Sequence, residues 1–523
     1  MTTLEMTRPA CAYDVIVVGG GGAGLTAALT AARLGRSVIL FEKNPVLGGT
    51  TRLSVGSISV CCTPHQRAAG ISDIPSEHFE DMGKLAGKLE ARDNLALRQR
   101  YVEEAPEAFR FLLDLGLEFM GPVAEPPHRH PRLHNVIPHS GSIVRGLLRA
   151  CRGEGVAVVT SAKVARLVTV GGCVTGVALA DGQNFVATRG VVLASGDYSS
   201  AGPELKSAFL PPGIAGIEGI NPTSTGDGQR MGREIGSEVL NPDLAWGPEL
   251  RFVPPARPSL VSRIPPVRFF ARLINWAVEA LPQRLLRPFL MSFVTTFLAP
   301  SHGLLREGGI LVNARGERFC EETLKPETAV ARQPDGVAWI LLSGDTARQF
   351  DAWPHFVSTA PGVAYAYLSD YRRNRGDICH VGDNLAKAAA KAGLPAGALE
   401  RTVADYNASD RGGRPEIAGA PFCILGPLKA WIAFTEGGLR VAGEQQVTDG
   451  AGDLIPGLYA AGSAGQGGLI LEGHGHHLGW AVVSGRIAGR AAAFAATNAN
   501  AGTAAPEVPA VASNPAARTA AAD

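Results

Sequence analysis

A glycine-rich turn near the start of the chain constrains the fold more than any other feature. Residues 14–18 form a short apolar run typical of a buried parallel strand, and Gly19-x-Gly21-x-x-Gly24 follows it directly. We expect an Ala- and Leu-rich helix over 25–34 and a second buried strand over 37–41, which ends at Glu42. This order of strand, turn, helix and strand predicts a Rossmann-type unit.

The glycines and the acidic residue each have a physical task in this pattern. Gly19 makes the turn, Gly21 lets the backbone reach a pyrophosphate, and Gly24 lets the helix pack closely on the strand. The phosphates would meet unpaired N–H groups at the start of the helix. Glu42 lies 18 residues beyond Gly24, where it can accept hydrogen bonds from a ribose hydroxyl. The pattern therefore predicts a bound dinucleotide.

Further glycine-rich segments favour FAD over a nicotinamide. Gly48-Gly49-Thr50-Thr51 follows Glu42 closely, and strands that end in glycine recur at 193–196 and 457–462. Each segment alone also fits an ordinary strand–turn junction. Together they suit a long cofactor on which separated parts of the chain converge.

Composition excludes several classes of protein. The 49 basic and 48 acidic residues leave no net field that would attract nucleic acid. The eight cysteines form no C-x-x-C pair, so we expect neither a disulfide framework nor a metal site. No export signal and no run of about 18 apolar residues is evident, so we expect a cytoplasmic location.

The pattern of elements predicts two lobes. We expect an α/β fold in which a Rossmann-type FAD-binding domain carries an inserted α+β substrate-capping domain. The FAD-binding domain would comprise residues 1–216 and 431–497, and the less regular, proline-rich stretch 217–430 would form the cap. Residues 498–523 are rich in Ala, Pro and Asn, and we expect a disordered tail.

As a set, the motifs resemble the flavoprotein superfamily of fumarate reductases and 3-ketosteroid dehydrogenases. The likeness covers nearly the whole chain and rests on the fingerprint with Glu42-Lys43, on Thr225-Gly226-Asp227-Gly228, on the Gly309–Asn313 and Gly316–Phe319 segments, and on Gly457–Gly462. It implies FAD in the first lobe and a mobile cap over the substrate. It also implies chemistry on a C–C/C=C pair beside a carbonyl or carboxylate.

The motifs and the resemblance together indicate which residues contact FAD. The family's covalent members attach the flavin through a histidine just after the glutamate strand, and residues 42–54 contain none, so we expect a non-covalent cofactor. The expected contacts are Gly19, Gly21, Ala23, Gly24, Glu42, Lys43, Gly49, Thr50, Thr51, Ser54, Gly56, Val164, Ala194, Ser195, Gly196, Asp227, Gly462, Ser463, His477 and Leu478.

Departures from the fumarate reductase pattern favour the ketosteroid dehydrogenase branch. The proton-donating arginine of fumarate reductases would fall near Lys325-Pro326, and the expected histidine before Gly437-Gly438 is Phe434. Arg306 matches one arginine of that relay only if a one-residue gap is allowed. The Leu471–Ala481 loop resembles the substrate loop of the ketosteroid dehydrogenases, although their tyrosine is Leu471 here.

In that loop the resemblance places Gly475 where a backbone N–H polarises the substrate carbonyl. The loop precedes a helix, so its N–H groups can stabilise an enolate oxygen, and the neighbouring His474 can reach a substrate. The candidate catalytic residues are therefore Gly475, His474 and Arg306. The expected substrate is an apolar cyclic ketone or enone, and the electron acceptor is a quinone, oxygen or a redox protein. A carboxylate reductase and an electron-transfer flavoprotein subunit are the alternatives.

A basic amphipathic pattern fills residues 251–300. Seven arginines alternate there with large apolar residues, against one acid, Glu279. The pattern fits peripheral contact with an anionic membrane or the gating of an apolar substrate. A helical cap packed on the main lobe is the interpretation that we favour.

Overall fold

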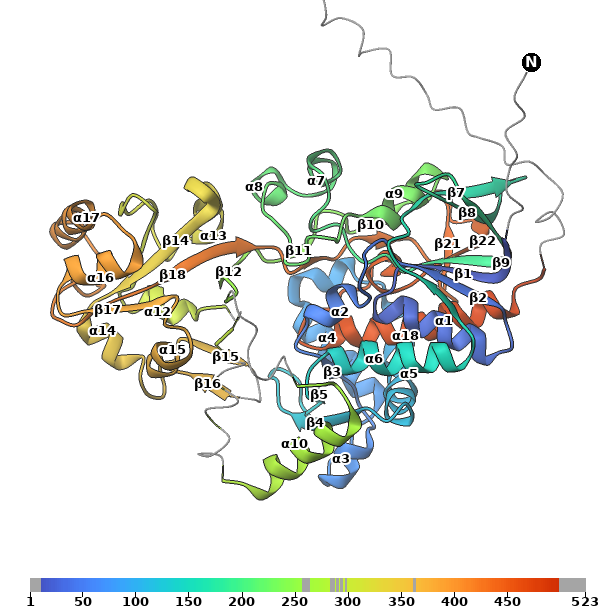
Figure 1. The fold of residues 1–523 in the computed structure, drawn as a ribbon, viewed down its shortest axis with the longest axis horizontal. Helices are drawn as coiled ribbons and strands as arrows, with labels where there is room; N and C mark the ends of the chain where they lie inside the picture. The colour runs from blue at the N-terminus through green and yellow to red at the C-terminus, as the bar shows by residue number, and fades with distance from the viewer. Residues whose placement is uncertain are drawn as a thin grey trace, which may run out of the picture.

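The chain folds into two lobes joined by short connecting strands (Figure 1). The computed structural model describes residues 11–255, 264–282, 287, 291, 295–296, 299–360 and 364–497. The expected tail at 498–523 and much of the stretch 283–298 lie outside the described residues. No helix of the described residues is long and apolar enough to cross a membrane.

The larger lobe is built on a parallel sheet with β1 (Cys11–Val18) at its centre. In strand order the sheet runs β21-β22-β9-β1-β2-β6, and all but the edge strand β21 are parallel. Val15–Val18 are buried on both faces, as an internal parallel strand requires. The other strands are β2 (Val38–Phe41), β6 (Ala157–Val159), β9 (Asn184–Leu193), β21 (Gln446–Thr448) and β22 (Leu454–Ala460). The predicted α/β class is confirmed.

Two helices distant in sequence pack face to face beneath this sheet. These are α1 (Gly22–Arg33) and α18 (His476–Phe494), and the contact is close because Gly485 and Gly489 lie against the α1 backbone. A Cβ at Gly489 would lie 2.4 Å from the Ala27 carbonyl oxygen. The contact ties the end of the described chain to the glycine fingerprint.

The same lobe includes a helical layer, a three-stranded sheet and an antiparallel meander that pairs with β9. The meander consists of β7 and β8, which pair antiparallel. These elements are α2 (Gly49–Leu53), β3 (Ser57–Ser59), α3 (Pro64–Ala68), α4 (Pro75–Ala86), η1 (Gly87–Arg92), α5 (Leu95–Asp114), β4 (Glu118–Val123), β5 (Leu133–Ile137), α6 (Gly141–Gly153), β7 (Val164–Val170) and β8 (Cys173–Leu179).

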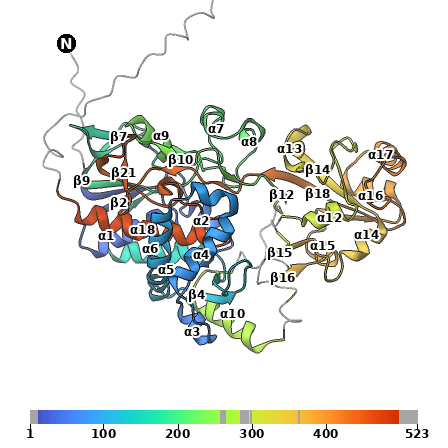
Figure 2. The ribbon, with the colours of Figure 1, turned by 180° about the vertical axis from the view of Figure 1, so that it is seen from behind.

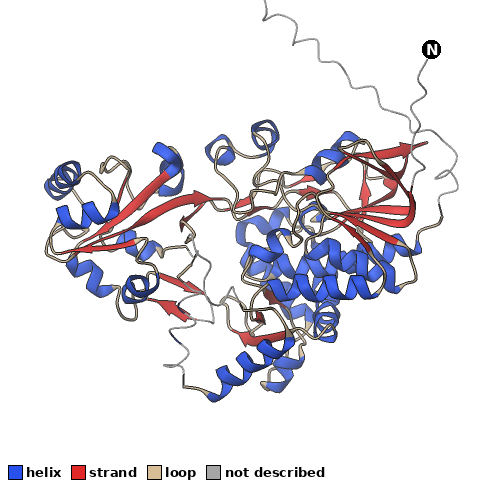
Figure 3. Ribbon diagram, in the orientation of Figure 1, coloured by secondary structure: helices blue, strands red, loops and turns tan. Residues whose placement is uncertain are grey.

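The smaller lobe has its own antiparallel sheet, seen as the red strands on the left of Figure 3. Its order is β12-β18-β14-β13, with β17 also paired to β18. The sequence of this region looks irregular because Pro and Gly interrupt the strands. Its elements are β12 (Glu249–Phe252), α12 (His302–Arg306), β13 (Ile310–Val312), α13 (Pro326–Ala331), β14 (Val337–Leu342), α14 (Gly344–Gln349), α15 (Leu368–Asn374), β17 (Cys379–Gly382), α16 (Leu385–Ala392), α17 (Ala396–Ala408) and β18 (Phe422–Trp431).

Short segments bridge the lobes. Residues at the lobe junction pair in two short ladders, β10 with β20 and β11 with β19. The view from behind in Figure 2 shows β18 running from the smaller lobe toward this junction. The junction elements are α7 (Pro203–Phe209), α8 (Pro212–Ala215), α9 (Asp227–Glu234), β10 (Val239–Leu240), β11 (Ala245–Trp246), β19 (Phe434–Thr435), β20 (Gly438–Leu439) and η4 (Gly462–Gly465).

Candidate active site

Three glycines that follow strands of the parallel sheet have open space where a side chain would stand, as a phosphate cradle requires. Gly21 follows β1, Gly49 follows β2 and Gly196 follows β9. A Cβ built on any of the three would meet nothing nearer than 3.9 Å, whereas one on Gly24 would lie 1.9 Å from the Gly19 carbonyl oxygen. Gly24 is therefore required for packing, and the other three leave room at the start of α1. The residues present fit the pyrophosphate of FAD.

Glu42 is buried at the end of β2 and its carboxylate organises the glycine turn. One oxygen, Oε2, accepts the N–H of Gly20 at 2.8 Å, while Oε1 accepts the backbone N–H of Asn44 at 2.9 Å and its side-chain amide at 2.8 Å. A carboxylate has lone pairs left for a ribose hydroxyl beyond these three donors. Glu42 thus holds the turn in addition to its predicted contact with the cofactor.

Lys43 and Asp227, both expected at the cofactor, bind each other. The Lys43 ammonium lies 2.7 Å from Asp227 Oδ2, and Thr225 donates to the same oxygen at 2.9 Å. Burial raises the pKa of Asp227, but hydrogen bonding and the charge of Lys43 lower it further, so the net shift is downward. The pair fastens the start of α9 to the end of β2.

The hydroxyl residues of the predicted site mostly bind backbone groups around the cradle. Thr51 accepts the N–H of Gly22 at 3.1 Å, and Ser195 accepts the N–H of Gly228 at 2.9 Å. Thr50 accepts the Asn221 amide at 2.9 Å, while Ser54 donates to the Thr51 carbonyl within α2. Around them, Gly56 has a φ of +89°, Val164 is buried at the start of β7, and Ala194 is buried after β9.

The segment after β22 returns to the fingerprint, as the sequence predicted. A Cβ at Gly462 would lie 2.9 Å from the Ala23 Cβ, and the Gly462 N–H donates to the Ser484 hydroxyl at 2.8 Å. Ser463 follows in η4, beside this contact. Leu478 is buried in the first turn of α18. The start of η4 therefore lies against α1 and is held by Ser484 of α18.

Gly475 is held in a conformation that only glycine adopts readily. It is the N-cap of α18 with a φ of +85°, and a Cβ there would lie 2.5 Å from the Ser59 nitrogen. Within the described part of the chain, no group accepts a hydrogen bond from the Gly475 N–H. This N–H remains available as a donor at the positive end of a 19-residue helix.

His474 forms an ion pair with Glu125, a residue that the sequence did not single out. Glu125 accepts hydrogen bonds from both the backbone N–H and the Nδ1 of His474. The hydrogen bond to Glu125 raises the pKa of His474 above its usual value, which favours the imidazolium. The ring is about half exposed, and its centroid lies 6.4 Å from that of Trp246 on β11. A cation and an aromatic wall thus adjoin the Gly475 donor.

His477 is fixed by two neighbours that sequence reasoning also missed. Its Nε2 lies 3.0 Å from Glu436 Oε1, and its ring centroid lies 3.8 Å from that of Phe434. Glu436 is buried and also accepts a hydrogen bond from Gln466. Both neighbours precede Gly437-Gly438. The sequence comparison identified Phe434 there only as the replacement of a family histidine.

Arg306 lies in the other lobe from these residues. It ends α12, is exposed, and makes no ion pair with any residue that the structure describes. Figure 1 shows α12 in the left-hand lobe and α18 in the right-hand one. The structure therefore brings Gly475 and His474 together but leaves Arg306 apart.

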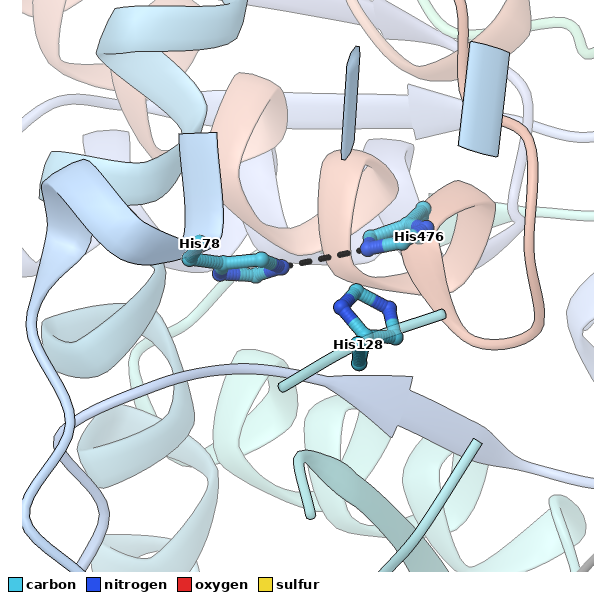
Figure 4. A group of neighbouring side chains, drawn as sticks. All are labelled: His78, His128 and His476. Atoms are coloured by element: carbon cyan, nitrogen blue, oxygen red, sulfur yellow. Dashed lines mark hydrogen bonds between the residues drawn. The ribbon is translucent and has the colours of Figure 1, made fainter. Parts of the chain in front are cut away.

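His78, His128 and His476 form a cluster next to Gly475, and His78 and His476 are fully buried in it (Figure 4). The ring centroids of His78, His128 and His476 are separated by 5.4 to 5.6 Å. His476 donates from Nδ1 to the Glu472 carbonyl oxygen at 2.6 Å, so its Nε2 accepts the proton of His78 Nε2 at 3.1 Å. Burial lowers the pKa of all three rings, that of His128 to about 4.

The buried Arg132 contacts this cluster and determines which ring nitrogen of His128 carries the proton. Arg132 binds Asp73 and Asp81 through charged hydrogen bonds of 2.6 to 2.7 Å and also donates to His128 Nδ1 at 3.0 Å. The His128 proton is therefore on Nε2, which leaves that nitrogen no lone pair for an ion. The expectation that the chain binds no metal stays a prediction, although three ligand-type side chains converge here.

Comparisons with known proteins agree with this geometry. A probable fumarate reductase of Shewanella frigidimarina is 26% identical over 93% of this chain and 75% of its own length, and the 4-oxocyclohexanecarboxylate 2-dehydrogenase of Sinomonas cyclohexanicum is 26% identical over 95% and 96%. The open conformation of a flavocytochrome c3 fumarate reductase matches with a TM-score of 0.69 at 25% identity, over 93% of this chain and 78% of that one.

The fold is also that of the 3-ketosteroid delta1-dehydrogenase from Sterolibacterium denitrificans, with a TM-score of 0.62 at 19% identity over 92% of this chain and 99% of that one. The predicted resemblance to fumarate reductases and ketosteroid dehydrogenases is confirmed, as is FAD as the cofactor. The family model described as FAD binding domain matches residues 14–263 and 271–470. The chain belongs to this FAD binding domain family and is an FAD-dependent oxidoreductase.

Proposed function

We propose that this enzyme oxidises or reduces a CH–CH/C=C pair beside the carbonyl of an apolar cyclic ketone or enone. The observation that carries the proposal is the Gly475 N–H, which has no acceptor among the described residues and lies at the N-terminus of α18. A ketone oxygen bound there gains negative charge as the adjacent carbon loses or gains a proton. A fixed N–H donor stabilises that charge more in the transition state than in the ground state.

FAD, when bound, supplies the hydride acceptor or donor. The residues of this chain would exclude water from the substrate, stabilise its oxyanion and move the proton. Trp246 and Phe434, whose ring centroids lie 5.4 Å apart, offer an apolar surface that excludes water from the carbonyl. The His474 imidazolium, held by Glu125, would add a second donor to the developing oxyanion or move a proton at the carbon beside it.

The name of one relative supports the ketone. The 4-oxocyclohexanecarboxylate 2-dehydrogenase is named for a compound that has a ring ketone and also a carboxylate, and this chain spans nearly all of that protein. The electron acceptor that completes the cycle would be a quinone, oxygen or a redox protein.

One observation favours a second candidate, a carboxylate reductase of the fumarate type. The exposed Arg306 lacks an ion-pair partner among the described residues, and a closing cap would bring such a cation toward the larger lobe. A substrate carboxylate bound between the lobes would then be the ion-pair partner of Arg306.

Anaerobic loss of the oxidised-flavin absorbance on mixing with candidate substrates distinguishes the two functions. Reduction by saturated cyclic ketones, or reoxidation of the reduced enzyme by the enones, supports the proposal. His474→Gln should then lower the rate of bleaching roughly 10²- to 10³-fold with the FAD content unchanged. Gly475 cannot serve as the test position, because the φ of +85° excludes proline and any Cβ contacts Ser59.

Arg306→Met is the counter-test, with Arg332→Met as its control because Arg332 is another exposed arginine of the smaller lobe. A reaction with dicarboxylates alone, lost in Arg306→Met and kept in Arg332→Met and His474→Gln, would replace the ketone by a carboxylate.

A further inference from the structure

We propose that helix α10 (Arg268–Ala280) binds the surface of an anionic phospholipid membrane and lies in the plane of its headgroups. This inference does not depend on the substrate proposed above. It rests on the outer face of the helix, which combines exposed apolar side chains with two arginines.

The apolar residues of α10 lie on two opposite faces. Ala271 is only 3% exposed and lies on the face that packs against the larger lobe. Phe269, Leu273 and Trp276, spaced by four and three residues, form a stripe on the other face and are 70%, 48% and 59% exposed. Leu281, directly after the helix, is 37% exposed and extends the stripe. Exposed aromatic residues in a row are uncommon on a soluble surface and mark an interaction site.

Two exposed arginines border this stripe, within a segment of the chain that is strongly basic. The side chains of Arg268 and Arg272 are 57% and 64% exposed, and both approach the same carboxylate oxygen of Glu118, at 3.3 and 3.4 Å. Glu118 and Glu279, the one acid of α10, equal these two arginines in number, but the surrounding segment 251–300 has seven arginines against that single acid and is strongly basic. An amphipathic helix with cations beside Trp and Phe is the arrangement that binds an anionic bilayer surface.

A shallow pocket on the same face has the matching chemistry. It has a volume of about 470 Å³ and is lined by Arg268, Phe269, Arg272 and Leu273. The guanidinium groups can bind a phosphodiester while the phenyl and leucine side chains contact the first methylenes of the acyl chains. A phospholipid has both parts in this order.

The position of the helix leaves the stripe accessible. In Figures 1 and 2 α10 lies at the lower rim of the molecule, below β4. A second copy of the chain is a poorer occupant, because a two-fold contact through this face would place the arginines of both copies close together. Since no helix of the described residues can span a bilayer, contact would be confined to the membrane surface.

Cosedimentation of the FAD-loaded enzyme with vesicles tests the proposal. We expect the enzyme to pellet with phosphatidylglycerol vesicles and to remain in solution with phosphatidylcholine vesicles. Phe269→Ser combined with Trp276→Ser should weaken the partition roughly 100-fold, about tenfold for each buried aromatic side chain. Arg268→Ser combined with Arg272→Ser should weaken it roughly 30-fold and remove the preference for anionic lipid.

Two matched controls come from the smaller lobe. Trp353 is 64% exposed and the Arg348 side chain is 64% exposed, so Trp353→Ser and Arg348→Ser remove equivalent groups elsewhere. Both should bind vesicles like the wild type. All variants change exposed side chains, and retention of FAD and of the melting temperature verifies their fold.

Three results would overturn the proposal. One is a wild type that pellets with neither vesicle, and another is binding that the α10 variants leave unchanged. The third is a dimer in solution that dissociates in the Phe269→Ser, Trp276→Ser variant while vesicles bind nothing, which would assign the stripe to a second copy.

Discussion

Gly21→Ala should separate FAD binding from folding. In the protein without FAD, a Cβ at Gly21 meets only the Gly48 carbonyl oxygen at 3.9 Å, and the backbone there is extended with a φ of −80°. Alanine therefore fits, and the loss of a favourable N-cap residue costs about 1 kcal/mol or less. The same methyl group would occupy the space that a pyrophosphate needs at the start of α1.

The expected loss of affinity follows from the hydrogen bonds at that position. Moving a phosphate out of reach of one backbone N–H removes a charge-assisted hydrogen bond of about 1.5–3 kcal/mol. That corresponds to roughly a 10- to 150-fold higher Kd. Titration of the apoprotein by quenching of flavin fluorescence measures the Kd, and melting curves with and without FAD measure the stabilisation by the ligand.

Gly202→Ala is the matched control for this substitution. Gly202 is also an N-cap glycine with extended backbone, at α7, and a Cβ there meets nothing within 4 Å. It should bind FAD like the wild type. Unchanged FAD affinity in Gly21→Ala, or equal loss in Gly202→Ala, would refute the assignment of the cradle.

Three further predictions test the neighbouring groups. Glu42→Gln directs an amide toward buried N–H donors, so it should destabilise the apoprotein by about 1–3 kcal/mol in a denaturant titration and weaken FAD binding. Arg132→Met removes the cation that pairs with the buried carboxylates of Asp73 and Asp81. The free energy of unfolding should fall by about 3–5 kcal/mol in the same titration, more than in the exposed-surface control Arg348→Met. The value of kcat/KM should fall as pH rises through the raised pKa of His474, because the imidazolium is lost there, and Glu125→Gln should move that fall to lower pH. A profile that Glu125→Gln does not move would exclude His474 as the titrating group.

The glycine fingerprint could be predicted because its information is local. Turn, helix and acidic residue lie within about thirty residues, and each glycine has a steric reason that the structure reproduces, such as the contact of Gly24 with Gly19. The strand predicted to end in glycine at 457–462 also follows from a local pattern, and β22 (Leu454–Ala460) lies there. Local patterns were thus enough to predict the parallel sheet and the glycine turn.

The partners of the catalytic candidates could not be predicted in this way. Glu125 lies 349 residues from His474, and His78 lies 398 residues from His476. No periodicity or spacing relates residues so distant, since their contact depends on how α4, the 124–132 loop and α18 pack together. Arg306 shows the opposite case, because a motif placed it at the reaction while the structure places it in the other lobe.

The pKa values of two histidines on one loop are shifted in opposite directions, that of His474 upward and that of His476 downward. This difference makes the pH dependence interpretable. His476 is fully buried beside His78 and His128, with the Arg132 guanidinium in contact with the cluster, so each further positive charge would be costly and the rings stay neutral at neutral pH. His474, two residues earlier, is paired with Glu125 and retains its proton above the usual pKa. The neutral cluster fixes the Glu472 carbonyl and with it the approach to Gly475, and rings that are already neutral lose no charge in the window above neutral pH. A change of rate in that window without loss of FAD therefore reports the imidazolium beside the proposed oxyanion site, rather than a rearrangement of the loop that presents it.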